Sequence, residues 1–160
     1  MSGGMLAEKT VDLLMGKGWK IAFAESCTGG LAAAALVDVP NASAVLDASI
    51  VTYANGAKIK YLGVMQESIE RQGVVSEEVA GQMAVGVARA NAADVGVGIS
   101  GIAGPGGGTP DKPVGMVCFG FFVDGRLAVR TVQFGAAGRN AVRRASVEYV
   151  YRTLEELLAD

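Results

Sequence analysis

The chain has 160 residues, enough for one domain with a substantial core, and a formal net charge of −2 without any run of basic residues. This pattern argues against a nucleic-acid-binding module, and no apolar run approaches the ~20 residues that span a membrane. The sequence contains no histidine, which excludes histidine-assisted nucleophiles and histidine metal sites. Its two cysteines, Cys27 and Cys118, argue against structural zinc and a disulfide framework.

Hydrophobic residues make up 51% of the chain, and the mean hydropathy is +0.35, which is high for a soluble monomer. We therefore expect a tightly packed core together with a subunit interface, and hence a homo-oligomer. Residues 1–10 show no basic segment followed by an apolar one, so no secretory signal is visible. Two lone cysteines are typical of a reducing cytoplasm, where we expect the protein to act.

The predicted elements alternate between helices and strands. Apolar residues at helical spacing from Leu6 to Leu14 predict a first helix, which Gly16 and Gly18 end. The other predicted elements are a strand at 20–24, a helix at about 28–37, a strand in the second half of 44–53, a short helix at 57–62, a helix from the cap Ser76 to about 92, a strand at 94–100, strands at 114–123 and 126–134 joined by Asp124-Gly125, and a helix at 138–158. This order predicts one domain over residues 1–160, a three-layer α/β/α sandwich with a mixed, mostly parallel sheet of about five strands.

The segment Ala-Glu-Ser-Cys-Thr-Gly-Gly at 24–30 joins a predicted strand to a predicted helix. Such a turn leaves backbone N–H groups free, which can attract anions and stabilise an oxyanion. It carries two possible nucleophiles, Ser26 and Cys27. Ser26 and Thr28 could instead cap the helix, and Cys27 could be a small buried side chain, the interpretation we prefer because no histidine can activate it.

Three unusual segments follow strands, at 24–30, 53–58 and 100–108. The carboxyl ends of parallel strands gather at one edge of a sheet, so these segments predict a pocket there. Segment 100–108 is rich in glycine, which favours close backbone contact with a ligand over a plain surface loop. The pattern G-x-G-x-x-G at 96–101 is an accidental match to a dinucleotide motif, because a loop follows it where a helix should begin.

The spacing of two sets of basic residues does not decide which of them belong to the predicted pocket. Lys58 and Lys60 both follow the 53–56 turn, and nothing in their spacing selects one of them. Arg139, Arg143 and Arg144 begin the last helix, where arginine is normally surface charge but can pair with a phosphate.

Four motifs in order resemble the CinA C-terminal domain family. They are Ala-Glu-Ser-Cys-Thr-Gly-Gly at 24–30, Val-Thr-Tyr-Ala-Asn-Gly-Ala-Lys at 51–58, Ser-Gly-Ile-Ala-Gly-Pro-Gly-Gly at 100–107, and Lys-Pro-Val-Gly at 112–115 with Arg139 further on. The resemblance covers about residues 6–157. Gly56 and Gly138 depart from the family pattern, which usually has acidic residues there, and these departures bear on substrate fit and rate.

The resemblance implies hydrolysis of the carboxamide of nicotinamide mononucleotide to nicotinate mononucleotide and ammonia, with neither a metal nor a cofactor. It implies Ser26 as nucleophile, assisted by Lys58 and Tyr53. The residues it implies in substrate binding are Cys27, Thr28, Gly29, Gly30, Ser100, Gly101, Gly104, Gly107 and Arg139.

A lysine can serve as the base only if its pKa falls from about 10.4 towards roughly 7–8. Burial and the positive end of the predicted helix at about 28–37 would both lower the pKa of Lys58. Two other functions stay open at this point. The same pocket could bind a nucleotide as a non-catalytic regulatory module, or hydrolyse another small amide.

Overall fold

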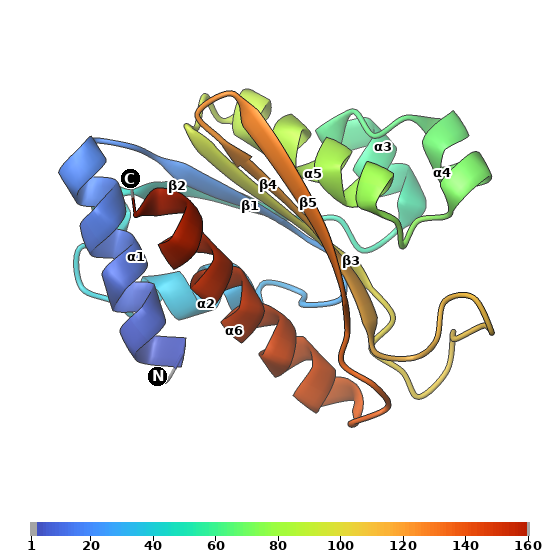
Figure 1. The fold of residues 1–160 in the computed structure, drawn as a ribbon. Coiled ribbons are helices and arrows are strands. Elements are labelled where there is room, and N and C mark those ends of the chain that lie inside the picture. Colours follow the sequence, from blue (N-terminus) through green and yellow to red (C-terminus); the bar gives the residue numbers. More distant parts are fainter. Residues whose placement is uncertain (1–2, 160) are drawn as a thin grey trace.

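A computed structural model describes residues 3–159 and shows a five-stranded sheet between two layers of helices (Figure 1). The elements in chain order are α1 (Gly3–Lys17), β1 (Ile21–Glu25), α2 (Leu31–Val37), a 3₁₀ turn η1 (Ala42–Ala44), β2 (Leu46–Val51), α3 (Asn55–Leu62), α4 (Gln66–Gln72), α5 (Glu77–Ala90), β3 (Val95–Gly101), β4 (Met116–Val123), β5 (Arg126–Gln133) and α6 (Arg139–Leu158). Within the described residues no helix is both long enough and apolar enough to cross a membrane.

The sheet has the strand order β2-β1-β3-β4-β5. β1 pairs in parallel with β2 and β3, whereas β4 pairs antiparallel with β3 and β5, so β4 alone runs against the other strands of the described sheet. In the β4–β5 turn, Asp124 and Gly125 both have positive φ, as a two-residue hairpin requires. The predicted fold class, a mixed sheet in an α/β/α sandwich, is confirmed.

Helices cover both faces of the sheet (Figure 1). α1, α2 and α6 pack together on one face, and α5 lies on the other, with α3 and α4 packed against it. The central strands β1 and β3 are buried almost throughout, as expected for strands covered on both sides, whereas β5 at the edge alternates between exposed and half-buried residues.

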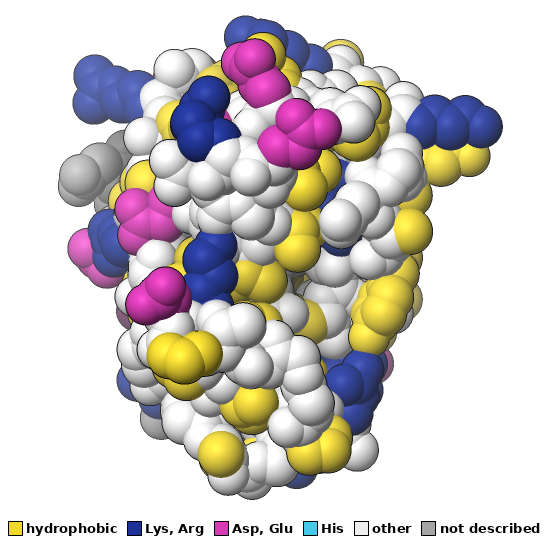
Figure 2. All heavy atoms as spheres, turned by 90° about the vertical axis from the view of Figure 1, so that its right-hand side faces the viewer, with side chains coloured by type: hydrophobic (Ala, Val, Ile, Leu, Met, Phe, Trp, Pro, Cys, Tyr) yellow, Lys and Arg dark blue, Asp and Glu magenta, His cyan; other side chains and the backbone are white. Residues whose placement is uncertain are grey.

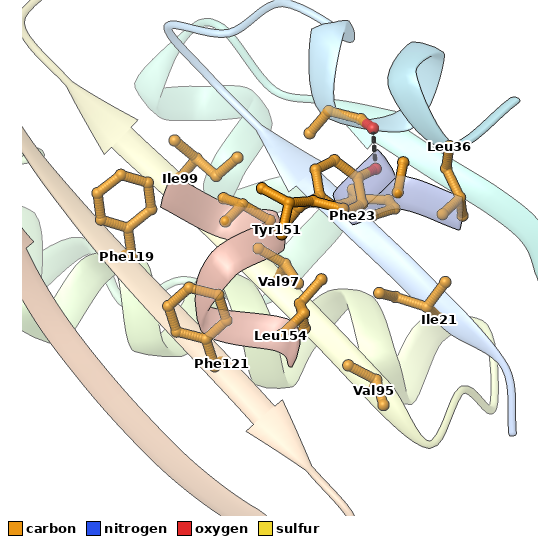
Figure 3. Close-up of a cluster of buried hydrophobic side chains, with 14 of the residues drawn as sticks. Ile21, Phe23, Leu36, Val95, Val97, Ile99, Phe119, Phe121, Tyr151 and Leu154 are labelled. Carbon is orange, nitrogen blue, oxygen red and sulfur yellow. Dashed lines mark hydrogen bonds between the residues drawn. The ribbon is translucent and has the colours of Figure 1, made fainter. Parts of the chain in front are cut away.

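The largest apolar cluster lies between the sheet and the α1/α2/α6 layer. Figure 3 shows Phe23 of β1 beside Tyr151 of α6, with ring centroids 6.2 Å apart. The Tyr151 hydroxyl donates a hydrogen bond to the carbonyl of Ala32 in the first turn of α2. This core therefore fixes α2 directly behind the segment that joins it to β1.

The glycines of the G-x-G-x-x-G pattern have a packing role. A Cβ atom at Gly96 would lie 2.1 Å from the Ala84 carbonyl oxygen, and one at Gly98 would lie 2.2 Å from that of Ala80. Both contacts are impossible for a real side chain, so these glycines allow the backbone of α5 to lie directly on β3. The interpretation of the pattern as an accidental match agrees with this arrangement.

Besides small shifts of element ends and the 3₁₀ turn η1, which was not predicted, two features differ from the sequence-based expectation. α4 was not predicted, because its seven residues are mostly polar and bury only Ser68 completely. α2 begins at Leu31 rather than near Thr28, because Gly29 and Gly30 have φ of 59° and 106°, which an α-helix cannot contain.

Candidate active site

A pocket of about 390 Å³ lies where β1, β2 and β3 end. The turn after β1, the start of α3, segment 73–75, the loop after β3 and the first residue of α6 all contribute to its lining. Figure 2 faces the side of the molecule that carries α4 and this loop, where basic and hydrophobic side chains surround a hollow. The three segments that the sequence analysis noted after strands, at 24–30, 53–58 and 100–108, thus meet at this pocket.

Lys58 of α3 is the most deeply buried cation at this pocket, with an exposed fraction of 1%. Its Nζ atom donates to Ser26 Oγ at 2.9 Å, to the Thr52 carbonyl at 2.6 Å and to the Tyr53 carbonyl at 3.2 Å. Burial lowers the pKa of Lys58 from 10.5 to about 8, against a smaller opposite effect of Cys27. The ammonium is therefore close to losing its proton near neutral pH.

The structure separates the two lysines that spacing alone could not. Lys60 is exposed, and its Nζ atom lies 5.1 Å from the centre of the Tyr61 ring. α3 begins at Asn55, so Lys58 lies on its inner side one turn later and points back to the end of β2. Of the pair, Lys58 alone contacts the turn after β1.

Ser26 and Cys27 are adjacent but differ in environment. Ser26 is half-buried and contacts Lys58, whereas Cys27 is almost fully buried. Burial raises the pKa of the Cys27 thiol to about 11, which the charge of Arg143 only partly opposes. The thiol is therefore protonated at neutral pH, and its side chain fits the interpretation as a small buried group.

Neither Ser26 nor Thr28 caps α2. Gly30 occupies the N-cap position, and the first turn is satisfied by Glu25 instead. One carboxylate oxygen of Glu25 accepts from the N–H groups of Gly30 and Ala32, and the other accepts from Ala33. The Glu25 side chain is fully buried. Its carboxylate therefore occupies N–H groups at the start of α2 that the sequence analysis expected to be free for a ligand.

The carbonyl side of the same turn is held from α6. Arg143 donates through Nε to the Cys27 carbonyl at 2.9 Å and through Nη2 to the Thr28 carbonyl at 3.1 Å. Its third nitrogen, Nη1, donates to the side chain of Asn140. The Glu25 carboxylate therefore binds N–H groups at the end of the turn and the start of α2, and the Arg143 guanidinium binds two carbonyl groups of the turn.

The opposite wall of the pocket is formed by the loop after β3 and the start of α6. Arg139 donates to the Gly104 carbonyl and to the Tyr53 hydroxyl, both at 2.7 Å. The Tyr53 side chain is 59% exposed, and its hydroxyl therefore lies at the pocket mouth. Ser100 is buried and donates to the Val74 carbonyl at 2.8 Å, which ties the end of β3 to segment 73–75.

The matches to known proteins agree with this geometry. Residues 4–158 match the model of the protein family described as the CinA C-terminal domain. The chain belongs to the CinA C-terminal domain family.

Two relatives differ in how much of their own length this chain covers. The chain is 47% identical to the nicotinamide-nucleotide amidohydrolase PncC of Enterobacter agglomerans, and the match covers 99% of both chains. It is 45% identical to a CinA-like protein of Kosmotoga olearia, of which it spans only 38%. Among solved structures, the competence/damage inducible protein CihA of Agrobacterium tumefaciens is 37% identical over 100% of both chains, with a TM-score of 0.94.

The residues that the family resemblance implies fall into two groups in the structure. Those that line the pocket are Ser26, Cys27, Tyr53, Lys58, Ser100, Gly101, Gly104, Gly107 and Arg139. Thr28, Gly29 and Gly30 lie behind the lining, where the Gly29 N–H donates to the Ser26 carbonyl and the Gly30 N–H donates to Glu25. Gly56 is exposed and lines no part of the pocket, and Gly138 is the N-cap residue of α6.

Sequence reasoning assigned no role to Glu25 or Lys112, and it considered Arg143 only as surface charge or as a partner of a phosphate. Glu25 and Arg143 hold the turn, and Lys112 donates to the carbonyl groups of Gln72 and Val75 in the pocket wall. A signal for Glu25 was present, since a carboxylate at the end of an apolar strand and before a helix can bind the helix N-terminus. Arg143 lies four residues after Arg139, which places both on one side of α6.

Proposed function

We propose that the chain hydrolyses the carboxamide of nicotinamide mononucleotide to nicotinate mononucleotide and ammonia, with Ser26 as nucleophile and Lys58 as base. The observation that carries the proposal is the 2.9 Å contact between Lys58 Nζ and Ser26 Oγ, made by an amine whose pKa burial lowers to about 8. An amide needs a strong nucleophile, and in a chain without histidine a neutral lysine can supply the base.

The three partners of Lys58 suit a neutral amine. Such an amine has two N–H bonds and one lone pair, and the carbonyl groups of Thr52 and Tyr53 can accept the two N–H bonds. The lone pair then faces Ser26 Oγ, whose proton it can take. Lys58 is thereby oriented as a base by backbone groups at the end of β2, without help from a second ionisable side chain.

In the proposed reaction, Ser26 Oγ attacks the carboxamide carbon while its proton passes to Lys58 Nζ. The carbonyl oxygen becomes an oxyanion, for which the turn offers the N–H group of Cys27, a residue that lines the pocket. This N–H group donates no hydrogen bond to another described residue. Removal of one oxyanion donor typically costs about 100–1000-fold in rate.

Collapse of the tetrahedral intermediate breaks the C–N bond and releases ammonia, which needs one proton. Lys58 can return the proton that it took from Ser26, and Tyr53 at the pocket mouth is the second candidate donor. A water molecule then attacks the acyl group on Ser26 and gives its proton to Lys58. Return of that proton to Ser26 Oγ breaks the acyl–oxygen bond and restores the site, and the acid product loses its remaining proton to solvent as the carboxylate.

The charge of the pocket supports a phosphorylated substrate. Lys58, Lys112 and Arg139 line it, and no carboxylate is among its lining residues, although the whole chain has a net charge of −2. A local cluster of cations in an acidic protein attracts an anion such as a phosphate monoester. The name of the full-length relative PncC, a nicotinamide-nucleotide amidohydrolase, supports the same substrate.

The test is ammonia release from nicotinamide mononucleotide by the purified protein, with nicotinate mononucleotide identified by chromatography. We expect both products in equal amounts and neither from a Ser26→Ala variant. Thermal stabilisation by the mononucleotide without ammonia release would contradict hydrolysis and favour a regulatory binding module. Ammonia from other amides alone would retain the chemistry and overturn the substrate.

A further inference from the structure

We infer that the edge strand β5 and the side of α5 next to it form a dimer interface, on which a second copy of this chain packs about a two-fold axis. Figure 1 shows β5 at one edge of the sheet, between the layer of α5 and the layer of α6. The inference goes beyond the proposed function, because this surface shares no lining residue with the pocket that contains Ser26 and Lys58.

The two edges of the sheet differ in how well they are protected from pairing with another strand. β2, at one edge, has six residues, and its register with β1 shifts between Ile21 and Phe23. β5, at the other edge, has eight residues, keeps an unbroken register with β4, and contains neither proline nor lysine. Short or irregular strands, lysine and proline are devices that keep sheet edges from pairing. The absence of these devices from β5 indicates an edge that another chain covers.

The side chains of β5 that face α5 are apolar and exposed. Leu127 and Val129 have exposed fractions of 48% and 37%, and they line a hollow of about 740 Å³ beside α5. Gly81 of α5 keeps this hollow open, because a Cβ atom there would lie 3.1 Å from Leu127 and 3.2 Å from Val129. A second hollow, of about 800 Å³, lies on the other side of the strand, between β5 and the end of α6. Hollows on both sides of one unpaired edge fit a second strand with its own side chains.

The hollow beside α5 carries opposite charges at its two ends. Glu77 and Glu78 line it at the start of α5, and Arg89 lines it near the end of the same helix. Glu78 pairs with Arg71 of its own chain. Glu77 and Arg89, in contrast, form no ion pair among residues 3–159. The surface therefore presents one negative and one positive end, each available to a partner.

This charge pattern is complementary to itself. The Thr131 hydroxyl donates to Glu77, so the start of α5 lies beside the end of β5, and Arg89 lies towards the beginning of that strand. A two-fold axis through the middle of β5 pairs the strand with its copy in the antiparallel direction and extends the sheet. Each Glu77 then lies on the same side of the axis as the second copy's Arg89. The occupant that fits these charges is therefore a second copy of this chain.

The size of the surface suits a stable dimer. The eight residues of β5 span about 26 Å, and the edge of a helix–sheet–helix sandwich is about 30 Å thick. Such an edge approaches the area of about 800 Å² that a standard protein interface takes from each partner. The hydrophobic content of 51%, from which the sequence predicted a subunit interface, agrees with this assignment.

The first test is sedimentation velocity over about a hundredfold range of protein concentration. We expect the wild type to sediment as a dimer, and Val129→Arg to raise the dissociation constant at least about tenfold, because a charge without a partner enters the interface. The matched control is Met15→Arg on α1, where the parent side chain is 46% exposed, and this variant should dimerise as the wild type does. Far-UV circular dichroism checks that each variant is folded.

The second test reverses the charges of α5. Arg89→Glu and Glu77→Arg should each raise the dissociation constant about 3–10-fold, since every substitution occurs twice in a symmetric dimer. The double variant restores opposite charges across the axis and should recover most of the wild-type affinity. Damage to the fold would add up in the double variant, so recovery separates the interface from a structural effect.

Three results would overturn the inference. A wild type that stays monomeric over the whole concentration range would leave the edge to an extended segment of another protein. A dimer that persists in Val129→Arg and dissociates in Met15→Arg would move the interface to α1. Weakening by both single reversals without recovery in the double variant would overturn the antiparallel two-fold arrangement. Ammonia release enters none of these measurements, so failure of the proposed function leaves the inference intact.

Discussion

The two walls of the pocket are built on different principles. On one wall Lys58 is buried, and the backbone of the adjoining turn after β1 is fixed from behind by Glu25 of β1 and Arg143 of α6. On the other wall, residues 105–111 are all exposed, and glycines make up much of the segment. From this difference we expect the proposed reaction geometry to depend on the buried wall, and substrate contacts on the exposed wall to be changeable without loss of the contact between Lys58 and Ser26.

The largest expected effect on the buried wall comes from Ser26→Ala. Loss of the proposed nucleophile should reduce kcat by about 10⁴-fold or more, because removing one member of a catalytic unit costs about as much as removing the whole unit. The exposed Ser43→Ala is the matched control and should retain the wild-type rate. Steady-state ammonia release measures both. Activity that survives in Ser26→Ala and disappears in Cys27→Ala would transfer the role to Cys27.

Lys58→Met should be nearly as damaging, with kcat reduced about 10²–10⁴-fold, the usual contribution of a positioned general base. Lys58→Arg should not restore the rate, because a guanidinium does not lose its proton in this pH range. The control on the same helix is Lys60→Met, whose parent side chain is exposed. Equal rates in Lys58→Met and Lys60→Met would leave the buried wall without its base.

Arg139→Gln probes the exposed wall. If Arg139 binds the phosphate, its loss should raise KM for nicotinamide mononucleotide about 10–100-fold, the equivalent of one charge-assisted hydrogen bond, with little change in kcat. The corresponding riboside, which lacks the phosphate, should show a much smaller change. Full steady-state curves for both substrates provide the measurement. A fall in kcat at constant KM would instead place Arg139 with the reaction geometry and remove the contrast between the walls.

The smallest effect is the pH dependence. With the pKa of Lys58 lowered to about 8, kcat/KM should rise about tenfold per pH unit below that value and level off above it. Between pH 8 and 10.5 the unfolded chain binds more protons at Lys58 than the native chain does, so the free energy of unfolding should rise with pH relative to Lys58→Met. Denaturant titrations across this range measure the second effect. A flat rate profile would indicate that the lysine is not the base.

Much of the fold was predictable because its signals are local. Asp124-Gly125 predicted the hairpin and Ser76 the start of α5, where the Val79 N–H does donate to the Ser76 hydroxyl. α4 escaped prediction because a short polar helix has no clear apolar periodicity. The expected homo-oligomer stays a prediction, which sedimentation velocity can test.

The site was predictable at the level of segments but not of contacts. Strand ends indicated where a pocket would form, yet the choice between Lys58 and Lys60 depended on where α3 begins and which side faces β2. The contacts of Glu25 and Arg143 depend on distant partners, since Arg143 and Cys27 are 116 residues apart in sequence. No local pattern encodes a contact of that separation.

The orientation of Glu25 also keeps its carboxylate from forming an ion pair with Lys58, the proposed base. A buried carboxylate next to an ammonium would hold the proton on the lysine and raise its pKa. Here α2 occupies both oxygens of Glu25, and no salt bridge to Lys58 occurs among residues 3–159. The charges of Glu25 and Lys58 both act on the Cys27 thiol, in opposite directions, yet the carboxylate is committed to the first turn of α2 and not to the lysine.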